Sequence, residues 1–360
     1  MFISDMLIIM KRYGYICLLL TMMMLLSSGC DQKELYMIDS RLVKVWVDFN
    51  FDKLKQTPAS MRVLFYPIQE NGLIGAPYVF DITGTGGYAN VPEGDFKVLA
   101  FNVDTENILQ SDESSFDLFR LTTASSEVET VIENSEKSEE KSFARSLFGS
   151  VLPRSADEDA FMLYDVPDFT CRCYTPLFHV DPIITQVTND NGESKKETVA
   201  KEKLTMQAET AVCTLSFDIK GIVGLVRANY VRATLSGVSC SYLMGEGRAT
   251  DEAGMVAFDC RIDKDNDVVH GKVYVWGFQP YGKADSRQFL NIYVWATGGN
   301  FYFTNDITDE LSEAVRQADI SKEFEFSLTT DLDITQGVVG NSGFEPSVGD
   351  WEEESRDIAL

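Results

Sequence analysis

Short segments in which apolar and polar residues alternate recur along most of the chain, with turn residues between them. In residues 42–49, for example, Val43, Val45 and Val47 fall on one side of an extended strand. Similar segments occupy residues 62–66, 78–82, 95–103, 161–164, 211–219, 230–235, 255–260, 272–278, 289–295, 301–303 and 324–328. Many short strands and few helices predict an all-β fold built from antiparallel β-sandwiches.

One segment departs from this alternation. Ile307, Leu311 and Ala314 recur at helical spacing. The spacing predicts a single short amphipathic helix over residues 308–318, with its apolar side packed on a sheet.

The strands fall into two sets, which predict two tandem domains. The N-terminal β-sandwich is expected at residues 42–166, with an acidic insertion at about 125–159 that we interpret as a long mobile loop. Prolines and a polar cluster predict that residues 167–203 are a crossover linking the domains. The C-terminal β-sandwich is expected at residues 204–340, and an acidic tail at residues 341–360.

The N-terminus has the parts of a secretory signal peptide. Lys11 and Arg12 precede an apolar run over residues 16–26, and small residues lead to Cys30. The segment resembles the signal of bacterial lipoproteins, in which the cysteine thiol takes a diacylglyceryl group and the chain is cut before it. A transmembrane helix is the alternative, but about 14 apolar residues are fewer than the roughly 20 that a bilayer requires.

The resemblance to lipoproteins implies a location. Residues 1–29 would be removed as a lipoprotein signal peptide, and residues 30–41 would form a polar lipid tether. Acyl chains on Cys30 would then hold the protein on the outer membrane, facing the cell surface.

The chain is strongly acidic. Its formal net charge of −25 repels nucleic acid and anionic lipid headgroups. No nucleic-acid partner is therefore expected, and membrane contact is expected through the lipid alone.

The cysteines do not form a disulfide framework. Five remain once Cys17 and Cys30 are set aside, namely Cys171, Cys173, Cys213, Cys240 and Cys260. An odd number leaves at least one thiol free or paired between chains, and one optional disulfide stays unassigned. Cys171 and Cys173 share one side of an extended segment, but their spacing fits no zinc module, so we favour packed or oxidised thiols and expect no metal and no cofactor.

The residues that could support catalysis are sparse. The two histidines, His179 and His270, are far in sequence from any nucleophile motif. Residues 263–267 imitate the start of a calcium loop but lack its glycine, so a solvated hairpin turn is the better interpretation. We expect no enzymatic activity, and an enzyme with an unrecognised carboxylate site remains an alternative.

Aromatic residues are concentrated in the second half of the chain. Tyr274, Trp276 and Phe278 alternate on one strand face, which favours a place in the core. A flat, exposed row of rings could instead stack on sugars, with Trp276 and Trp295 as the candidates. A glycan-binding surface lipoprotein is therefore an alternative function.

The motifs resemble one family. The lipoprotein signal, the segment Val91-Pro92-Glu93-Gly94-Asp95-Phe96, the strand that follows it and the tail from Gly343 to Trp351 are similar to fimbrillin-like lipoproteins associated with type V pili. Within that group the chain is most similar to a domain-of-unknown-function family of gut bacterial lipoproteins. The resemblance implies two β-sandwiches of transthyretin-like topology and a role in fimbrial assembly or adhesion.

Type V pilins are processed at an arginine. In that family a protease cuts near the first strand, and a C-terminal strand of the next subunit fills the vacated groove. Arg41 lies in a suitable region, and Arg145 and Arg154 are alternatives. The acidic segment from Trp351 to Asp357 makes a poor donor strand. The resemblance therefore implies a lipid-anchored accessory or anchor subunit, with other fimbrial subunits or a host ligand as partners.

Overall fold

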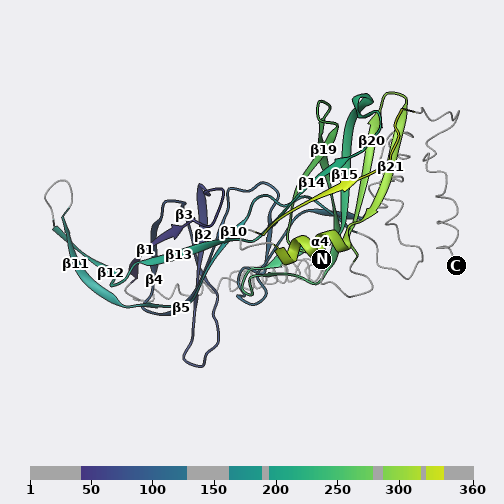
Figure 1. The fold of residues 1–360 in the computed structure, drawn as a ribbon. Coiled ribbons are helices and arrows are strands. Elements are labelled where there is room, and N and C mark those ends of the chain that lie inside the picture. Colours follow the sequence, from purple (N-terminus) through teal and green to yellow (C-terminus); the bar gives the residue numbers. More distant parts are fainter. Residues whose placement is uncertain (1–41, 128–161, 189–193, 279–286, 318–321, 336–360) are drawn as a thin grey trace, which may run out of the picture. The chain divides into compact units, whose positions relative to one another are not determined.

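The structure is a computed structural model that describes residues 42–127, 162–188, 194–278, 287–317 and 322–335 (Figure 1). Cys30 and Arg41 lie outside the described residues. So do the predicted signal peptide, tether and acidic tail, and nearly all of the predicted acidic insertion.

The first sheet has the strand order β11-β12-β1-β13-β10-β5-β2-β3, and β4 pairs with β1. Its strands are β1 (Val43–Asn50), β2 (Ser60–Pro67), β3 (Tyr78–Thr83), β4 (Gly87–Val91), β5 (Gly94–Asn102), β10 (Cys171–Val180), β11 (Pro182–Thr188), β12 (Ser194–Ala200) and β13 (Leu204–Thr210). The pairing is antiparallel except that β1 runs parallel to β12 and β13.

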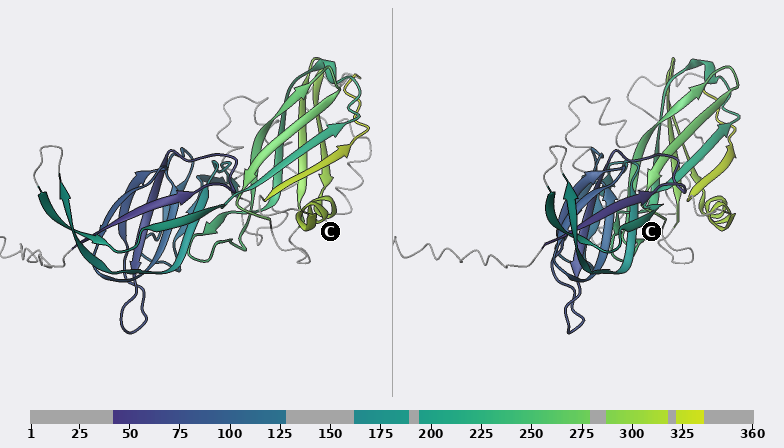
Figure 2. Two further views of the ribbon diagram at one scale, coloured as in Figure 1. Left: turned by 60° about the vertical axis from the view of Figure 1, so that its left-hand side comes forward. Right: turned by 90° about the vertical axis from the view of Figure 1, so that its left-hand side faces the viewer.

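The second sheet has the order β21-β20-β15-β18-β19-β14-β22, with β9 paired to β18 and β8 to β9. Its strands are β8 (Ser125–Glu127), β9 (Met162–Tyr164), β14 (Cys213–Lys220), β15 (Ala228–Ser239), β18 (Ala253–Asp263), β19 (Val268–Val275), β20 (Phe289–Ala296), β21 (Gly299–Asp306) and β22 (Glu323–Thr329). Figure 2 shows each sheet curving around its own interior.

A small third sheet joins segments that are distant in sequence. Its order is β17 (Arg248–Ala249), β16 (Ser241–Leu243), β7 (Arg120–Thr122) and β6 (Leu109–Ser111). A 3-10 turn, η1 (Leu225–Arg227), precedes β15.

The predicted all-β class is confirmed, and so is the short helix. In the described part of the chain one α-helix occurs, α4 (Thr308–Gln317). Leu311 and the preceding Ile307 are buried in the second core, and Asp306 accepts a hydrogen bond from the backbone N–H of Thr308 at 3.1 Å. The apolar side of the helix therefore packs on the sheet, as the spacing indicates.

In the first core, the apolar residues that alternate along β1 pack against side chains of other strands. Val43, Val45 and Val47 of β1 are at most 1% exposed and face Phe65 and Phe96 from the opposite strands. Gly94 has a φ of +145°, a conformation that favours glycine, and opens β5 directly after Pro92 and Glu93. The Pro92–Gly94 turn thus places Phe96 in the core.

β2 and β5 are buried on both faces. Leu64, Tyr66, Leu99 and Phe101 point away from the first core into a third cluster, where they meet Trp276 and other residues of the second half. Continuous burial explains why these two strands read as nearly uninterrupted apolar runs.

The structure corrects the expected domain boundaries. Residues 167–203 are not a crossover, because they hold β10, β11 and β12 of the first sheet. Residues 204–210 form β13 and also pair within the first sheet, with β1 and β10. Conversely, β8 and β9, which were expected in the N-terminal sandwich, belong to the second sheet. The chain therefore passes between the two sheets more than once.

Candidate interaction surface

The first strand, β1, is fully integrated in its sheet. It pairs with β4 from Val43↔Val91 to Val47↔Gly87, and with β13 from Val47↔Leu204 to Asn50↔Gln207. It begins two residues after Arg41. A cut after Arg41 would therefore leave this strand whole.

The outward side of β1 carries exposed aromatic rings. Trp46 pairs with Tyr88 of β4, and the two ring centroids lie 4.8 Å apart in an edge-to-face arrangement. The ammonium group of Lys44 lies 4.2 Å from the Tyr88 ring centroid and 3.3 Å from Glu197 of β12. We call Lys44, Trp46, Tyr88 and Glu197 the aromatic patch.

The aromatic patch is accessible but not flat. Trp46 is 36% exposed and Tyr88 52% exposed. Their edge-to-face geometry and the Lys44 ammonium leave no coplanar pair of ring faces, so a ligand could stack on one ring at a time and not across both. The alternation in β1 placed Trp46 opposite the valines, but nothing in the local pattern marked it as a binding residue.

A two-stranded hairpin extends from the same sheet. β11 and β12 pair over seven residue pairs, whereas the backbone register between β12 and β1 has one pair in the described residues, Lys44↔Val199. Figure 1 shows the hairpin extending beyond the neighbouring strands. Ile184 on β11 is 67% exposed.

A buried arginine links the first sheet to the second half of the chain. The guanidinium of Arg172, on β10, donates to the backbone carbonyl oxygens of Met244 at 2.6 Å and Gly245 at 3.2 Å. It also bonds Glu209 at 2.6 Å. At Gly247, whose φ is +72°, a side chain would lie 2.9 Å from this guanidinium. We call this arrangement the Arg172 joint.

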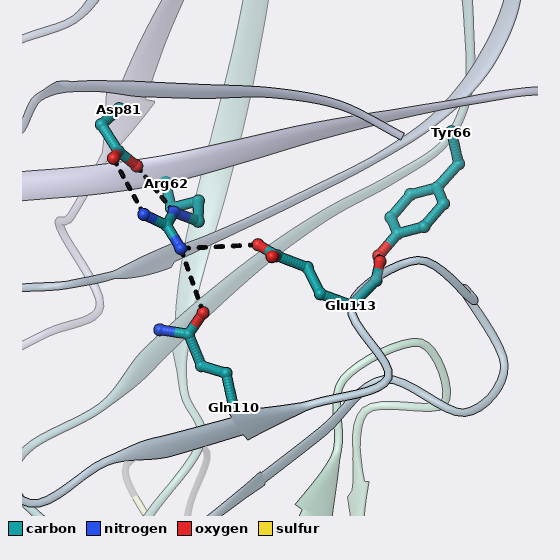
Figure 3. Close-up of polar contacts among 5 residues, drawn as sticks. All are labelled: Arg62, Tyr66, Asp81, Gln110 and Glu113. Atoms are coloured by element: carbon teal, nitrogen blue, oxygen red, sulfur yellow. Dashed lines mark hydrogen bonds and ion pairs between the residues drawn. The ribbon is translucent and has the colours of Figure 1, made fainter. Parts of the chain in front are cut away.

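A second arginine fastens a loop to the outside of the first sheet (Figure 3). Arg62 donates to both carboxylate oxygens of Asp81, at 2.7 and 2.9 Å, and to Gln110 at 3.2 Å. The hydroxyl of Tyr66 donates to the backbone oxygen of Glu113 at 2.7 Å. The Arg62 hydrogen bond lowers the pKa of Asp81. These contacts hold a loop in place and form no reactive group.

The predicted sugar-stacking residues are not brought together. Trp276 is 3% exposed and packs beside Tyr242 at a centroid distance of 6.1 Å, so the core interpretation is correct and this ring cannot bind sugar. Trp295, by contrast, is 38% exposed.

All five cysteines of the described chain are free thiols, so the optional disulfide does not form among them. Cys171 and Cys173 both face the first core, as their spacing predicted. Burial raises the pKa of Cys171 and Cys260 to about 12 and that of Cys213 to about 11. These thiols are therefore poor nucleophiles.

The histidines lie on separate surfaces. His179 bonds Asp95 at 2.7 Å, and the hydrogen bond raises its pKa. His270 bonds Asp218 at 2.6 Å and lies 3.7 Å from Asp263. Asp263 also bonds Asn266 in a hairpin turn, as expected for a solvated turn. Within the described ranges, no three metal-binding side chains are grouped.

Among the described residues, the structure has no helix with the length and apolar character needed to cross a membrane.

Comparison with known proteins identifies relatives. A family described as "Domain of unknown function (DUF5119)" matches residues 29–259. A Bacteroides ovatus protein named "Putative fimbrium anchoring subunit Fim4B" is 31% identical over 107 residues, which cover 29% of this chain and 30% of that protein. The match thus spans less than a third of the relative's length.

A solved structure has the same fold. The crystal structure of a protein described as a "putative adhesin" from Bacteroides ovatus superposes with a TM-score of 0.56 and 16% identity. The match covers 87% of this chain and 99% of that chain.

Proposed function

The chain belongs to the DUF5119 family, and we propose that it is a lipid-anchored accessory or anchor subunit of a fimbrium. In this proposal Cys30 carries the lipid at the outer membrane, and the two sheets face the cell surface. The shared fold and the name of the Bacteroides ovatus relative support the fimbrial assignment. No catalytic activity is proposed.

The position of β1 supports an anchor rather than a shaft subunit. In the type V pilins that the sequence resembles, cutting after an arginine vacates the groove that receives a donor strand. Here Arg41 precedes β1, and the next arginine, Arg62, already lies inside β2. The flanking Met61 and Val63 are fully buried. A cut after Arg41 would leave β1 in place, and Arg62 stands between buried residues where a protease has little access. The groove of β1 therefore stays filled, and the chain would end a polymer.

Mass spectrometry of the mature protein from its native host tests this function. We expect an N-terminus at lipidated Cys30, and we expect the Cys30→Ser variant to leave the membrane fraction because its acyl chains are lost. Cys17→Ser, in the segment expected to be removed, is the matched control and should stay membrane-bound. An unlipidated chain that begins at Leu42 would contradict the anchor role.

Glycan binding is the second candidate, favoured by the exposed rings of the aromatic patch. If it is correct, Trp46→Ala and Tyr88→Ala should each weaken binding on a glycan array by at least about ten-fold, since ring stacking contributes on the order of 1–3 kcal/mol. Trp295→Ala serves as the comparison on the second sheet. Equal signals from all variants would contradict this candidate.

A further inference from the structure

We propose that β11 is a docking edge, to which an extended segment of another fimbrial subunit adds as a further strand. The inference rests on the proposed function and names the surface that such a subunit would use. β11 pairs with β12 from Pro182↔Ala200 to Thr188↔Ser194, and no described strand pairs with its other side. Its outward N–H and C=O groups are therefore available to another backbone.

The hairpin is weakly supported by its own sheet. A two-stranded hairpin is marginally stable in water, because it buries little surface. In the described chain, β12 has a single registered pair with β1. A third strand along β11 would turn the hairpin into a three-stranded sheet, which is the smallest unit expected to be stable.

The edge of β11 lacks the usual protection. Natural edge strands are short or carry charges that block pairing with other chains. The β11 sequence PIITQVT has no charge, and its proline stands at the first position. Other end strands of the described sheets carry carboxylates, at Asp81 in β3, Asp306 in β21 and Glu323 in β22, while β6, β8 and β17 have only two or three residues. β4, which pairs only with β1, is also uncharged but has five residues. Within the described part of the chain, β11 is therefore the longest uncharged end strand.

Apolar side chains on β11 face both sides of the hairpin. Ile183 is 40% exposed and Ile184 is 67% exposed, and successive residues of a strand point to opposite faces. An added strand would cover both side chains if it carried apolar residues opposite them. This pattern favours an extended partner segment over a globular surface.

Charge selects another subunit over a second copy of this chain. Each copy of this chain has a formal net charge of −25, so two copies repel one another. The hairpin itself is nearly neutral, because residues 181–203 hold five carboxylates, at 181, 190, 193, 197 and 202, against four lysines, at 195, 196, 201 and 203. An extended segment of a less acidic subunit would therefore meet less repulsion at this edge than a second copy would.

Photocrosslinking in the fimbriated native host tests the docking edge. The photoreactive residue p-benzoylphenylalanine replaces Ile184 in the full chain and, as a matched control, Val79, which is 43% exposed on β3 at the other end of the same sheet. We expect an adduct from position 184 alone, mapped by mass spectrometry to one extended segment of a fimbrial subunit. An adduct between two copies of this chain, or equal yields at both positions, would overturn the inference.

A charge substitution gives the second measurement. Ile184→Lys should reduce the amount of this chain that co-sediments with sheared fimbriae at least ten-fold, whereas Val79→Lys should not. Both variants should keep the wild-type thermal midpoint, because both side chains are exposed. If Ile184→Lys co-sediments like the wild type, the docking edge is wrong while the fimbrial role stands. If the wild-type protein itself does not co-sediment with fimbriae, both the docking edge and the proposed function are wrong.

Discussion

At the scale of single residues, two basic side chains lie in opposite settings. Arg172 is buried, with 6% of its side chain exposed, and its partners include two backbone carbonyls. His179 is exposed and bonds a single carboxylate, Asp95. Buried hydrogen bonds to a charged side chain stabilise the fold. An exposed pair such as His179 and Asp95 contributes little to stability and mainly shifts the pKa of its titratable member.

Replacing Arg172 should destabilise the protein. Arg172→Met leaves the carbonyls of Met244 and Gly245 without this donor, and we expect a loss of about 2–4 kcal/mol in the free energy of unfolding. Glu209→Gln is the matched control, because Glu209 is 48% exposed, and it should cost about 1 kcal/mol or less. Urea denaturation measures both, and equal losses would contradict a buried joint.

The titration of His179 should depend on Asp95. The hydrogen bond to Asp95 raises the pKa of His179, so its stabilising effect is complete below the unfolded-state pKa and is lost as pH rises through the folded-state pKa. NMR titration should give a pKa above the ordinary value of about 6.5. Asp95→Asn should lower it and leave the His270 resonance unchanged. An unchanged His179 titration would refute the assignment.

At the scale of elements, β14 and β19 show one large ring filling the space over a glycine. Phe217 of β14 is registered with Gly271 of β19, and a Cβ at Gly271 would lie 2.0 Å from the ring. The ring also stacks on Phe326 of β22, with 5.7 Å between centroids. Because Gly271 has no side chain, the Phe217 ring of β14 can lie over β19 and at the same time contact Phe326 of β22.

Adding a methyl group at this position should overpack the second core. We expect Gly271→Ala to lower the free energy of unfolding by about 1–3 kcal/mol. In a double-mutant cycle, Phe217→Leu should recover part of this loss, because the smaller side chain leaves room for the methyl group. Additive losses in urea denaturation would show that the ring and the methyl do not meet.

At the scale of the whole molecule, the third apolar cluster joins residues from both sheets. It includes Leu64 and Phe101 of the first sheet together with Tyr242 of the small third sheet and Trp276, which follows β19 of the second sheet, while Tyr274 of β19 packs against it. The pairing of β7 with β16 and the Arg172 joint add to it. A shared core of this kind predicts that the described residues unfold as one cooperative unit.

Thiol labelling should reveal this cooperativity. Cys171 lies in the first sheet and Cys213 in the second, and burial raises the pKa of both, so neither should react with iodoacetamide at pH 8 without denaturant. Both should become reactive at the same urea concentration. Labelling of one thiol well before the other would indicate that the halves unfold separately.

Local sequence determined the faces of many elements. Alternation placed the β1 valines inward and Trp46 outward, helical spacing located α4, and the Pro92–Gly94 turn preceded the buried Phe96. These features depend on backbone geometry over a few residues, which a local pattern records directly.

Only the tertiary structure decided which segments pair and which faces are covered. The polar composition of residues 167–203 suggested a crossover, yet these residues pair with strands near the start of the chain. Alternation also predicted that the Trp276 side chain lies on one particular face of its strand. It could not show that residues more than a hundred positions away in the sequence bury that side chain. Strand pairing and burial on a second face depend on contacts between distant parts of the chain, and a period of two residues carries no information about the partner.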